Sequence, residues 1–270
     1  MQKLRPYYIV LSYQAFRKHF HELKKGDLIG IRLPLKREET GLIIDLINRK
    51  VEAFPSFLSQ ILSTSKTLQA EILKKFMLPY TFSIRDKTTL LSVISELSQL
   101  KGKFQKFITK DDRANCGLGV RLWNSLEEIY NVAGTPILSF PFVLQPFFEN
   151  IRDIRVVILG EYHIEAYERV NPYNFRKNLF FGGKPKIYEL TEKERKFCEK
   201  VMKRGKFPYA HLDLIYIGDK GPYLSEISLR GGIKGAKITH QAYEETVKKI
   251  HQNFYKKWEE KYSPVEYLTP

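Results

Sequence analysis

Two carboxylates, Asp213 and Glu226, lie on apolar runs that flank a Gly-Asp-Lys-Gly turn, a pattern typical of a β-hairpin. With Asp219 and Lys220 at the centre of the turn, the register places Asp213 directly across from Glu226. Cross-strand partners lie about 4.5–5.5 Å apart, and two like charges at that distance destabilise a hairpin unless a cation offsets them. The pattern therefore favours a hard divalent cation such as Mg²⁺, which prefers carboxylate oxygens. The alternative is a solvated acidic pair on an exposed hairpin.

The composition of this 270-residue chain is typical of a folded protein, and its positive charge indicates an acidic binding partner. Hydrophobic residues make up 43% and charged residues 28% of the sequence, and the formal net charge is +15. A nucleic acid, an anionic membrane surface, a polyphosphate nucleotide or an acidic protein would each suit this charge. Lysine and arginine are spread along the whole chain, however, and no basic-aromatic RNA-binding motif or zinc-finger spacing occurs.

The cysteine content and the hydropathy of the sequence indicate where in the cell the protein is expected. Only Cys116 and Cys198 occur, which is too few for a disulfide framework and lacks the spacing of metal ligands. No run approaches the roughly 18 apolar residues of a membrane span, and the first residues lack the core of a signal peptide. We therefore expect a cytoplasmic protein that does not interact with membranes.

The elements around the hairpin supply further candidate groups. A strand over 104–110 ends at Lys110, and a loop with Gly117 and Gly119 leads to a second strand over 120–123. Such a strand, loop and strand can fold over a triphosphate, with backbone N–H groups facing the phosphates, although a plain hairpin turn explains the two glycines equally well. Helices are expected over 87–100, 191–204 and 237–261, and the last eight residues are expected to be a loosely held tail.

Several short motifs follow one another between Ser63 and about Lys237, and their order is more specific than any one of them. They are Ser63-Thr-Ser-Lys66, Lys110 with the loop to Gly117-Leu-Gly-Val120, Gln145-Pro-Phe-Phe148, Asp153-Ile-Arg155, Arg169 with Phe175-Arg-Lys-Asn178 and Gly182-Gly183, and the two hairpin carboxylates with Ser228 and Gly232-Ile-Lys-Gly235. This succession resembles that of the ATP-grasp carboxylate–amine ligases, and within them the α-L-glutamate ligase (RimK-like) and glutathione-synthetase branch.

The resemblance implies a role for each motif. The residues that match contacts to ATP are Lys66, Lys110, Gly117, Gly119, Gln145, Phe147 and Asp153. The residues that match contacts to the phosphates and the reacting acyl group, and thus catalytic roles, are Arg169, Arg176 and Asn178. The residues on the magnesium-ligand pattern are Asp213, Glu226 and Ser228. The implied cofactors are ATP and Mg²⁺, with two metal ions expected and Mn²⁺ as an alternative.

The resemblance also implies the fold. We expect an α+β protein with the ATP-grasp fold, in which two α/β lobes clamp ATP. Residues 63–140 would form the first lobe with its glycine loop, and residues 141–270 the second lobe with the magnesium site and a C-terminal helix. Residues 1–62 would form a small α/β lobe before them.

Three residues depart from the family pattern. Ser228 stands where the family has asparagine, which weakens one metal ligand, although a hydroxyl oxygen can still accept a cation or hold a water on it. Ala114 replaces a loop glycine, and Pro146 replaces a glutamate, which removes a carboxylate and a backbone donor. These departures leave open an ATP-grasp protein that binds nucleotide but is catalytically weakened.

The activity that the resemblance implies is ADP-forming ligation, in which ATP activates a carboxylate as an acylphosphate that an amine then attacks. The expected partners are a small molecule or peptide with a carboxylate, with glutamate as one candidate, and an amine acceptor. The positive charge would also suit an acidic protein or peptide as substrate. The remaining alternative, a basic nucleic-acid-binding protein, would leave the acidic hairpin and Asp153 unexplained.

Overall fold

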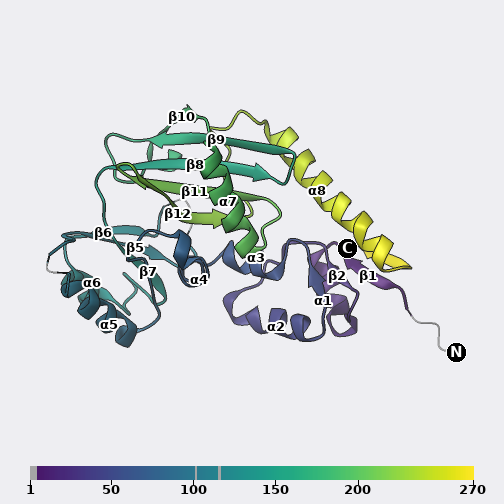
Figure 1. Cartoon of the computed structure of the whole chain (residues 1–270). Helices are drawn as coiled ribbons and strands as arrows, with labels where there is room; N and C mark the ends of the chain where they lie inside the picture. The colour runs from purple at the N-terminus through teal and green to yellow at the C-terminus, as the bar shows by residue number, and fades with distance from the viewer. Residues whose placement is uncertain (1–4, 101, 115–116) are drawn as a thin grey trace. The chain divides into compact units, whose positions relative to one another are not determined.

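The computed structural model describes residues 5–100, 102–114 and 117–270 (Figure 1). Cys116 and its neighbour in the predicted glycine loop lie outside these ranges. The chain forms two compact units. Unit 1 combines the described residues up to Gln60 with Lys206–Tyr209 and Ile238–Pro270, and unit 2 comprises those of Ile61–Gly205 and Ala210–Lys237.

Unit 1 is built on a small parallel sheet with the strand order β13-β1-β2-β3. Its strands are β1 Tyr7–Val10, β2 Leu28–Ile29, β3 Glu52–Ala53 and β13 Val265–Leu268. Its helical segments are α1 Tyr13–His19, η1 Phe20–Glu22, η2 Arg37–Glu39, α2 Thr40–Asn48 and α8 His240–Lys261. Helix α8 packs through aromatic side chains: Phe254 stacks on Phe54 with ring centroids 4.0 Å apart, and Trp258 Nε1 donates to the Gly26 carbonyl at 3.0 Å.

The end of the chain is a strand, so the prediction of a loose tail was wrong. Strand β13 pairs in parallel with β1, with Tyr7 opposite Val265 and Val10 opposite Leu268. Residues 238–270 therefore belong to unit 1, whereas the predicted boundaries had assigned them to the second lobe. The boundaries at 62 and 140 remain a prediction. A short polar tail carries no local signal for a strand whose partner lies at the other end of the chain.

Ending the chain at Lys261 is expected to lower the melting temperature by roughly 4–8 °C. The truncation exposes one edge of β1 and removes the side chain of Leu268, which is only 8% exposed and contributes about 2 kcal/mol through its burial. Differential scanning fluorimetry measures the change. Removal of Thr269 and Pro270 alone, which leaves β13 intact, serves as the control and should change nothing. An unchanged melting temperature in the longer truncation would contradict the strand.

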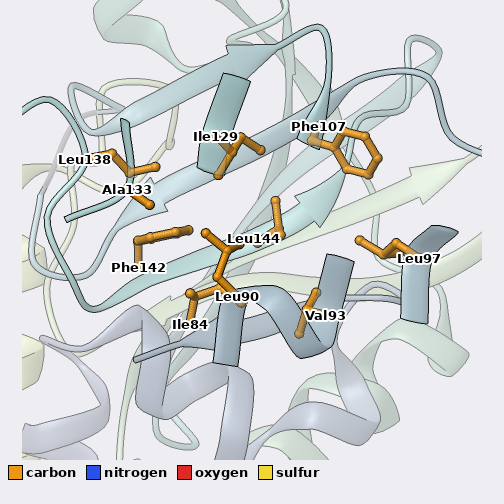
Figure 2. Close-up of a cluster of buried hydrophobic side chains, with 10 residues drawn as sticks. All are labelled: Ile84, Leu90, Val93, Leu97, Phe107, Ile129, Ala133, Leu138, Phe142 and Leu144. Atoms are coloured by element: carbon orange, nitrogen blue, oxygen red, sulfur yellow. The ribbon is translucent and has the colours of Figure 1, made fainter. Parts of the chain in front are cut away.

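The first sheet of unit 2 has the order β4-β7-β5-β6, and all of its pairs are antiparallel. Its strands are β4 Phe82–Ile84, β5 Phe107–Asp111, β6 Val120–Trp123 and β7 Phe142–Pro146, and its helices are α5 Lys87–Ser98 and α6 Leu126–Val132. Side chains of both helices meet those of the sheet in one apolar core (Figure 2). The core consists of Ile84, Leu90, Val93, Leu97, Phe107, Ile129, Ala133, Leu138, Phe142 and Leu144.

The second sheet of unit 2 is an antiparallel sheet of the order β10-β9-β8-β11-β12 (Figure 1). Its strands are β8 Ile151–Leu159, β9 His163–Val170, β10 Lys184–Tyr188, β11 Ala210–Ile217 and β12 Lys220–Ser228. The other segments of unit 2 include α4 Lys66–Ile72, η3 Lys74–Phe76, η4 Leu179–Phe181 and α7 Glu192–Gly205, while α3 Phe57–Leu62 crosses the boundary. No helix in the described part of the chain is long and apolar enough to span a bilayer.

A capping box begins the predicted helix α7. Glu194 accepts hydrogen bonds from the backbone N and the hydroxyl of Thr191, at 2.7 and 2.8 Å. Its other oxygen accepts from the hydroxyls of Tyr188 and Tyr216, which fasten the helix to β10 and β11. A carboxylate that is almost fully buried is thereby satisfied by neutral donors.

The predicted pairing in the β11–β12 hairpin is also confirmed, but the predicted turn was wrong. Asp213 lies opposite Glu226. Near the tip, however, Ile217 pairs with Lys220, so that Gly218 and Asp219 form the turn. Two register shifts along the hairpin, of the kind that β-bulges cause, absorb the difference.

Candidate active site

The carboxylate of Asp213 on β11 is neutralised by two arginines of the same sheet. Arg155 on β8 lies directly opposite Asp213 and donates to both of its oxygens, from Nε to Oδ1 and from Nη2 to Oδ2 at 3.1 Å. Arg169 on β9 bridges two carboxylates, since its Nη2 lies 2.9 Å from Asp213 Oδ2 and 2.6 Å from Asp153 Oδ1. These side chains share one face of the sheet because residues two apart on a strand point the same way.

Burial and the neighbouring charges shift the pKa values of the groups in this cluster. Burial by itself raises the pKa of Asp213, but Arg155 and Arg169 outweigh it and hold that pKa well below its usual range. Burial raises the pKa of Asp153, with Arg169 opposing the shift. Burial disfavours a charged Arg169, yet the two aspartates more than offset this and raise its pKa. Asp213 is therefore anionic and held in place by arginine.

Two lysines from distant parts of the chain approach the same hairpin. Lys66, the first residue of α4, places Nζ 3.5 Å from Glu226 Oε1 and also donates to the carbonyl of Ala114. Lys110 on β5 donates from Nζ to the hydroxyl of Ser225 at 3.1 Å. Burial lowers the pKa of Lys110, Glu226 opposes this shift, and Lys66 adds to it.

Basic side chains outnumber acidic ones in this cluster. Four basic side chains lie with three acidic ones, namely Lys66, Lys110, Arg155 and Arg169 with Asp153, Asp213 and Glu226. A buried excess of positive charge is unfavourable without a counter-ion. The cluster can therefore stabilise a bound anion such as a phosphate.

Arg176 and Asn178 lie beside the glycine loop. Arg176 donates from Nη2 to the carbonyl of Val120, and its guanidinium lies over the rings of Phe175 and Phe181, 4.4 and 4.8 Å from their centroids. Burial and the nearby Arg121 lower the pKa of Arg176. Its Nε is buried and has no hydrogen-bond partner among the residues that the structure describes. An unsatisfied buried donor on a cation suits a negatively charged ligand group.

The loop glycines pack tightly against neighbouring side chains, and Gly117 lies against Asn178. Asn178 caps η4, since its Oδ1 accepts from Phe181 N at 3.2 Å. Gly117 has φ +73°, and a Cβ there would come within 2.6 Å of Asn178 Nδ2. A Cβ on Gly119 would clash with the side chains of Ala114 and Asp111. Both positions therefore require glycine.

Two of the predicted ATP contacts, Gln145 and Phe147, lie on strand β7 of the first sheet and directly after it. Gln145 is buried on β7 opposite Ile108. Phe147 donates its backbone N–H to the Lys106 carbonyl at 2.9 Å, and its ring contacts Phe175 edge to face, with centroids 6.0 Å apart. In the described part of the chain, no hydrogen bond or ion pair joins Gln145 or Phe147 to the charged cluster. A nucleotide requires an apolar surface for its base and a charged surface for its phosphates.

The residues on the predicted magnesium pattern fit a hard cation in their chemistry. Glu226 is half-exposed and pairs only loosely with Lys66, so its oxygens remain available, and Asp213 next to it is anionic. Ser228 lies two residues beyond Glu226 on β12 and donates its hydroxyl to the Arg230 carbonyl at 2.7 Å, which leaves lone pairs on Oγ. No set of three or more His, Cys, Asp or Glu side chains in the described ranges could hold a metal by itself. Water or phosphate oxygens would have to complete the shell.

Three further residues position this site, and none of them had a role predicted from the sequence. Arg155 stands in the Asp-Ile-Arg motif, and its spacing of two from Asp153 could have placed it on the same face. Asn171 holds the segment around Arg176, because its Nδ2 donates to the carbonyls of Arg176 and Phe181. Gln69 fastens α4 to β12 and is nearly fully buried. No local pattern marks Asn171 or Gln69.

Gln69→Ala is expected to lower the free energy of unfolding by about 2–3 kcal/mol. The amide of Gln69 donates to the carbonyls of Leu62 and Ile227 and accepts from Ile227 N, at 2.6–3.0 Å, and the variant would leave these buried groups unpaired. Urea denaturation measures the loss. Gln241→Ala, which removes an exposed amide bonded to Glu245, is the control and should cost less than about 0.5 kcal/mol. Equal losses in both variants would contradict the role of Gln69.

Comparisons with known proteins identify the family of the chain. The sequence model of the RimK-like ATP-grasp domain matches residues 64–250. Glutathione synthetase of Agrobacterium fabrum is 26% identical over 156 residues, which cover 53% of this chain and 46% of that protein. Ribosomal protein bS6–L-glutamate ligase of Escherichia fergusonii is 32% identical over 89 residues, 33% of this chain and 29% of that one. The chain thus matches less than half the length of these two relatives.

A solved structure supports the fold. The RiPP-associated ATP-grasp ligase of Chryseobacterium gregarium, determined with ADP and a leader and core peptide, superposes with a TM-score of 0.53 at 16% identity. The alignment covers 83% of this chain and 71% of that one. The predicted α+β fold of the ATP-grasp type is thereby confirmed. Because the family model matches most of the chain and the fold agrees with it, this chain belongs to the RimK-like ATP-grasp family.

Proposed function

We propose that the protein is an ATP- and Mg²⁺-dependent carboxylate–amine ligase that forms a peptide-type bond through an acylphosphate, with glutamate as one candidate substrate. The observation that carries this proposal is the approach of Lys66 and Lys110 to the acidic hairpin, with more positive than negative charge in a buried cluster. A triphosphate would supply the missing negative charge, and the lysines would offset it during phosphoryl transfer.

Each side chain of the site has a task in this reaction. Lys66 and Lys110 would hold the phosphates, and Gln145, Phe147 and Asp153 would hold the base and ribose. The backbone N–H groups at Gly117 and Gly119 would face the phosphates, as expected for a glycine-containing loop. A divalent cation held by Asp213, Glu226 and Ser228, with a second ion in the same set, would neutralise charge on the transferred phosphoryl group.

The acyl-transfer half of the reaction falls to the arginines and Asn178. An acylphosphate forms when the substrate carboxylate attacks the γ-phosphorus and ADP leaves. An amine then attacks the acyl carbon, and phosphate departs. Arg169 or Arg176, together with Asn178, would donate to the oxyanion of that step. Support for Arg176 comes from its buried Nε, which has no hydrogen-bond partner in the described part of the chain.

The net charge of +15 suggests an acidic partner for the ligase. Positive surface charge raises the association rate of an acidic macromolecule, so an acidic peptide or protein is a candidate substrate beside small molecules. The predicted cytoplasmic location stays a prediction. Screening ADP release across amino acids, acidic peptides and a cell extract would identify the carboxylate and the amine.

Mg²⁺ with ATP is expected to raise the melting temperature by roughly 5–10 °C. A ligand at a hundred times its dissociation constant adds about 2.7 kcal/mol to the free energy of unfolding. Thermal melting with ATP, ADP and a non-hydrolysable analogue at millimolar Mg²⁺ tests this, with inorganic phosphate as the control.

Two other outcomes would point elsewhere. A thermal shift without ADP release from any substrate would favour a nucleotide-binding protein that has lost its catalytic activity. The departures from the family pattern at Ser228 and Pro146 would then be the first candidates to explain the loss. No shift with any nucleotide, together with tight and salt-dependent binding of nucleic acid, would overturn the ligase in favour of a nucleic-acid-binding protein.

A further inference from the structure

Asp112, just after β5, makes a set of hydrogen bonds to the first turn of α4. Its Oδ1 accepts from the hydroxyl of Ser65 at 2.8 Å, the hydroxyl of Thr67 at 2.6 Å and the backbone N of Thr67 at 2.9 Å. Its backbone carbonyl accepts from Lys66 N at 3.1 Å. One aspartate thus holds three consecutive residues, and Lys66 is the central one.

This contact is not the ordinary cap of a helix. Ser65 is already the N-cap of α4, since its hydroxyl accepts from Leu68 N at 3.2 Å. Asp112 lies 45 residues further along the chain from Thr67, so its bonds are tertiary and join α4 to the loop between β5 and β6. Bonds from hydroxyl and amide donors to a carboxylate are stronger than those between neutral groups.

The same loop also holds the far end of Lys66. The ammonium group of Lys66 donates to the carbonyl of Ala114, two residues after Asp112, and lies 3.5 Å from Glu226. Ser65, Lys66 and Thr67 are each less than 10% exposed. A lysine that is fixed at its backbone and restricted at its side chain loses less conformational entropy when it binds a ligand.

We propose that Asp112 is a positioning residue of the nucleotide site, which acts through Lys66 by fixing the first turn of α4. This inference rests on the proposed function, because it assumes that Lys66 contacts bound nucleotide. It goes beyond it in assigning a role to a residue outside the site residues named above. Asp112 itself need not touch the ligand.

A double-mutant cycle on nucleotide affinity tests the inference. Isothermal titration with Mg²⁺ and a non-hydrolysable ATP analogue is run on the full chain, on Asp112→Ala, on Lys66→Ala and on the double variant. We expect Asp112→Ala to weaken binding about tenfold, as for the loss of a bond to a charged group. In the Lys66→Ala background, the same substitution should have no further effect, because the lysine through which it acts is gone.

Controls separate positioning from loss of structure. Asp111→Ala, which breaks the neighbouring ion pair with Arg121 at 2.5 Å but leaves α4 untouched, should bind as wild type does. Thr67→Val, which removes one donor to Asp112, should show a smaller loss than Asp112→Ala. If Asp112→Ala does not fold, Asp112→Asn takes its place in the cycle, since it keeps the acceptor oxygen and loses only the charge.

The outcomes are distinct. Equal losses from Asp112→Ala with and without Lys66 would overturn the inference and leave the nucleotide site standing. Wild-type affinity in Asp112→Ala would overturn it as well. No binding by the wild-type chain would overturn the proposed function and this inference together.

Discussion

Glu226→Gln is expected to reduce ATP-dependent turnover by roughly 10²-fold or more while lowering the free energy of unfolding by less than about 1 kcal/mol. The carboxylate is half-exposed, and its contact with Lys66 at 3.5 Å is loose, so little stability depends on it. In the proposed mechanism, the same oxygens would hold a divalent cation. ADP release under saturating Mg²⁺ measures the first effect, and urea denaturation the second.

Glu168→Gln is a matched control for this variant. Glu168 is also a glutamate of the second sheet with a cationic partner, Arg152 at 3.1 Å, but it takes no part in the charged cluster. Its substitution should leave turnover unchanged. Wild-type turnover in Glu226→Gln would refute the metal assignment.

Ser228→Asn tests the third residue of the predicted metal site. Asparagine is the family's usual ligand at this position, so the variant should keep or raise activity if Ser228 belongs to the metal shell.

Asp213→Asn is expected to lower the free energy of unfolding by about 3 kcal/mol and to abolish turnover as well. The substitution leaves Arg155 and Arg169 buried without one of their counter-charges, and an amide cannot accept from both guanidinium groups as the carboxylate does. This differs from the expectation for an isolated pair of carboxylates, in which removing one charge would relieve repulsion. The arginines therefore reverse the sign of the predicted stability effect.

Urea denaturation decides between the two expectations for Asp213. Asp219→Asn, in the turn of the same hairpin, is the control and should change stability by less than about 0.5 kcal/mol. A stability of Asp213→Asn equal to or above that of wild type would show that repulsion from Glu226 outweighs the two ion pairs. The contrast between a stable Glu226→Gln and an unstable Asp213→Asn is the signature that this site predicts.

The pairing of Asp213 with Glu226 was predictable because it is local. The two strands are adjacent in sequence, and alternation of side chains with a period of two fixes which residues share a face. The position of the turn was missed, since two register shifts moved it by one residue. The order of motifs from Lys66 to Ser228 likewise sufficed to identify the family, because motif order is a property of the sequence itself.

The ion pairs of Asp213 and the pairing of β13 with β1 depend on contacts between distant segments, which no local sequence pattern encodes. Arg155 reaches Asp213 across 58 residues of chain, and Gln69 reaches β12 across 158. Sequence alone thus determined the family and which carboxylates face each other, and it predicts which residues carry the chemistry. Only the tertiary structure decided that arginines neutralise Asp213, that Asp112 holds Lys66, and that the last residues complete the sheet of β1. The physical reason is that burial and long-range pairing set the charge balance, and both arise only when distant segments pack together.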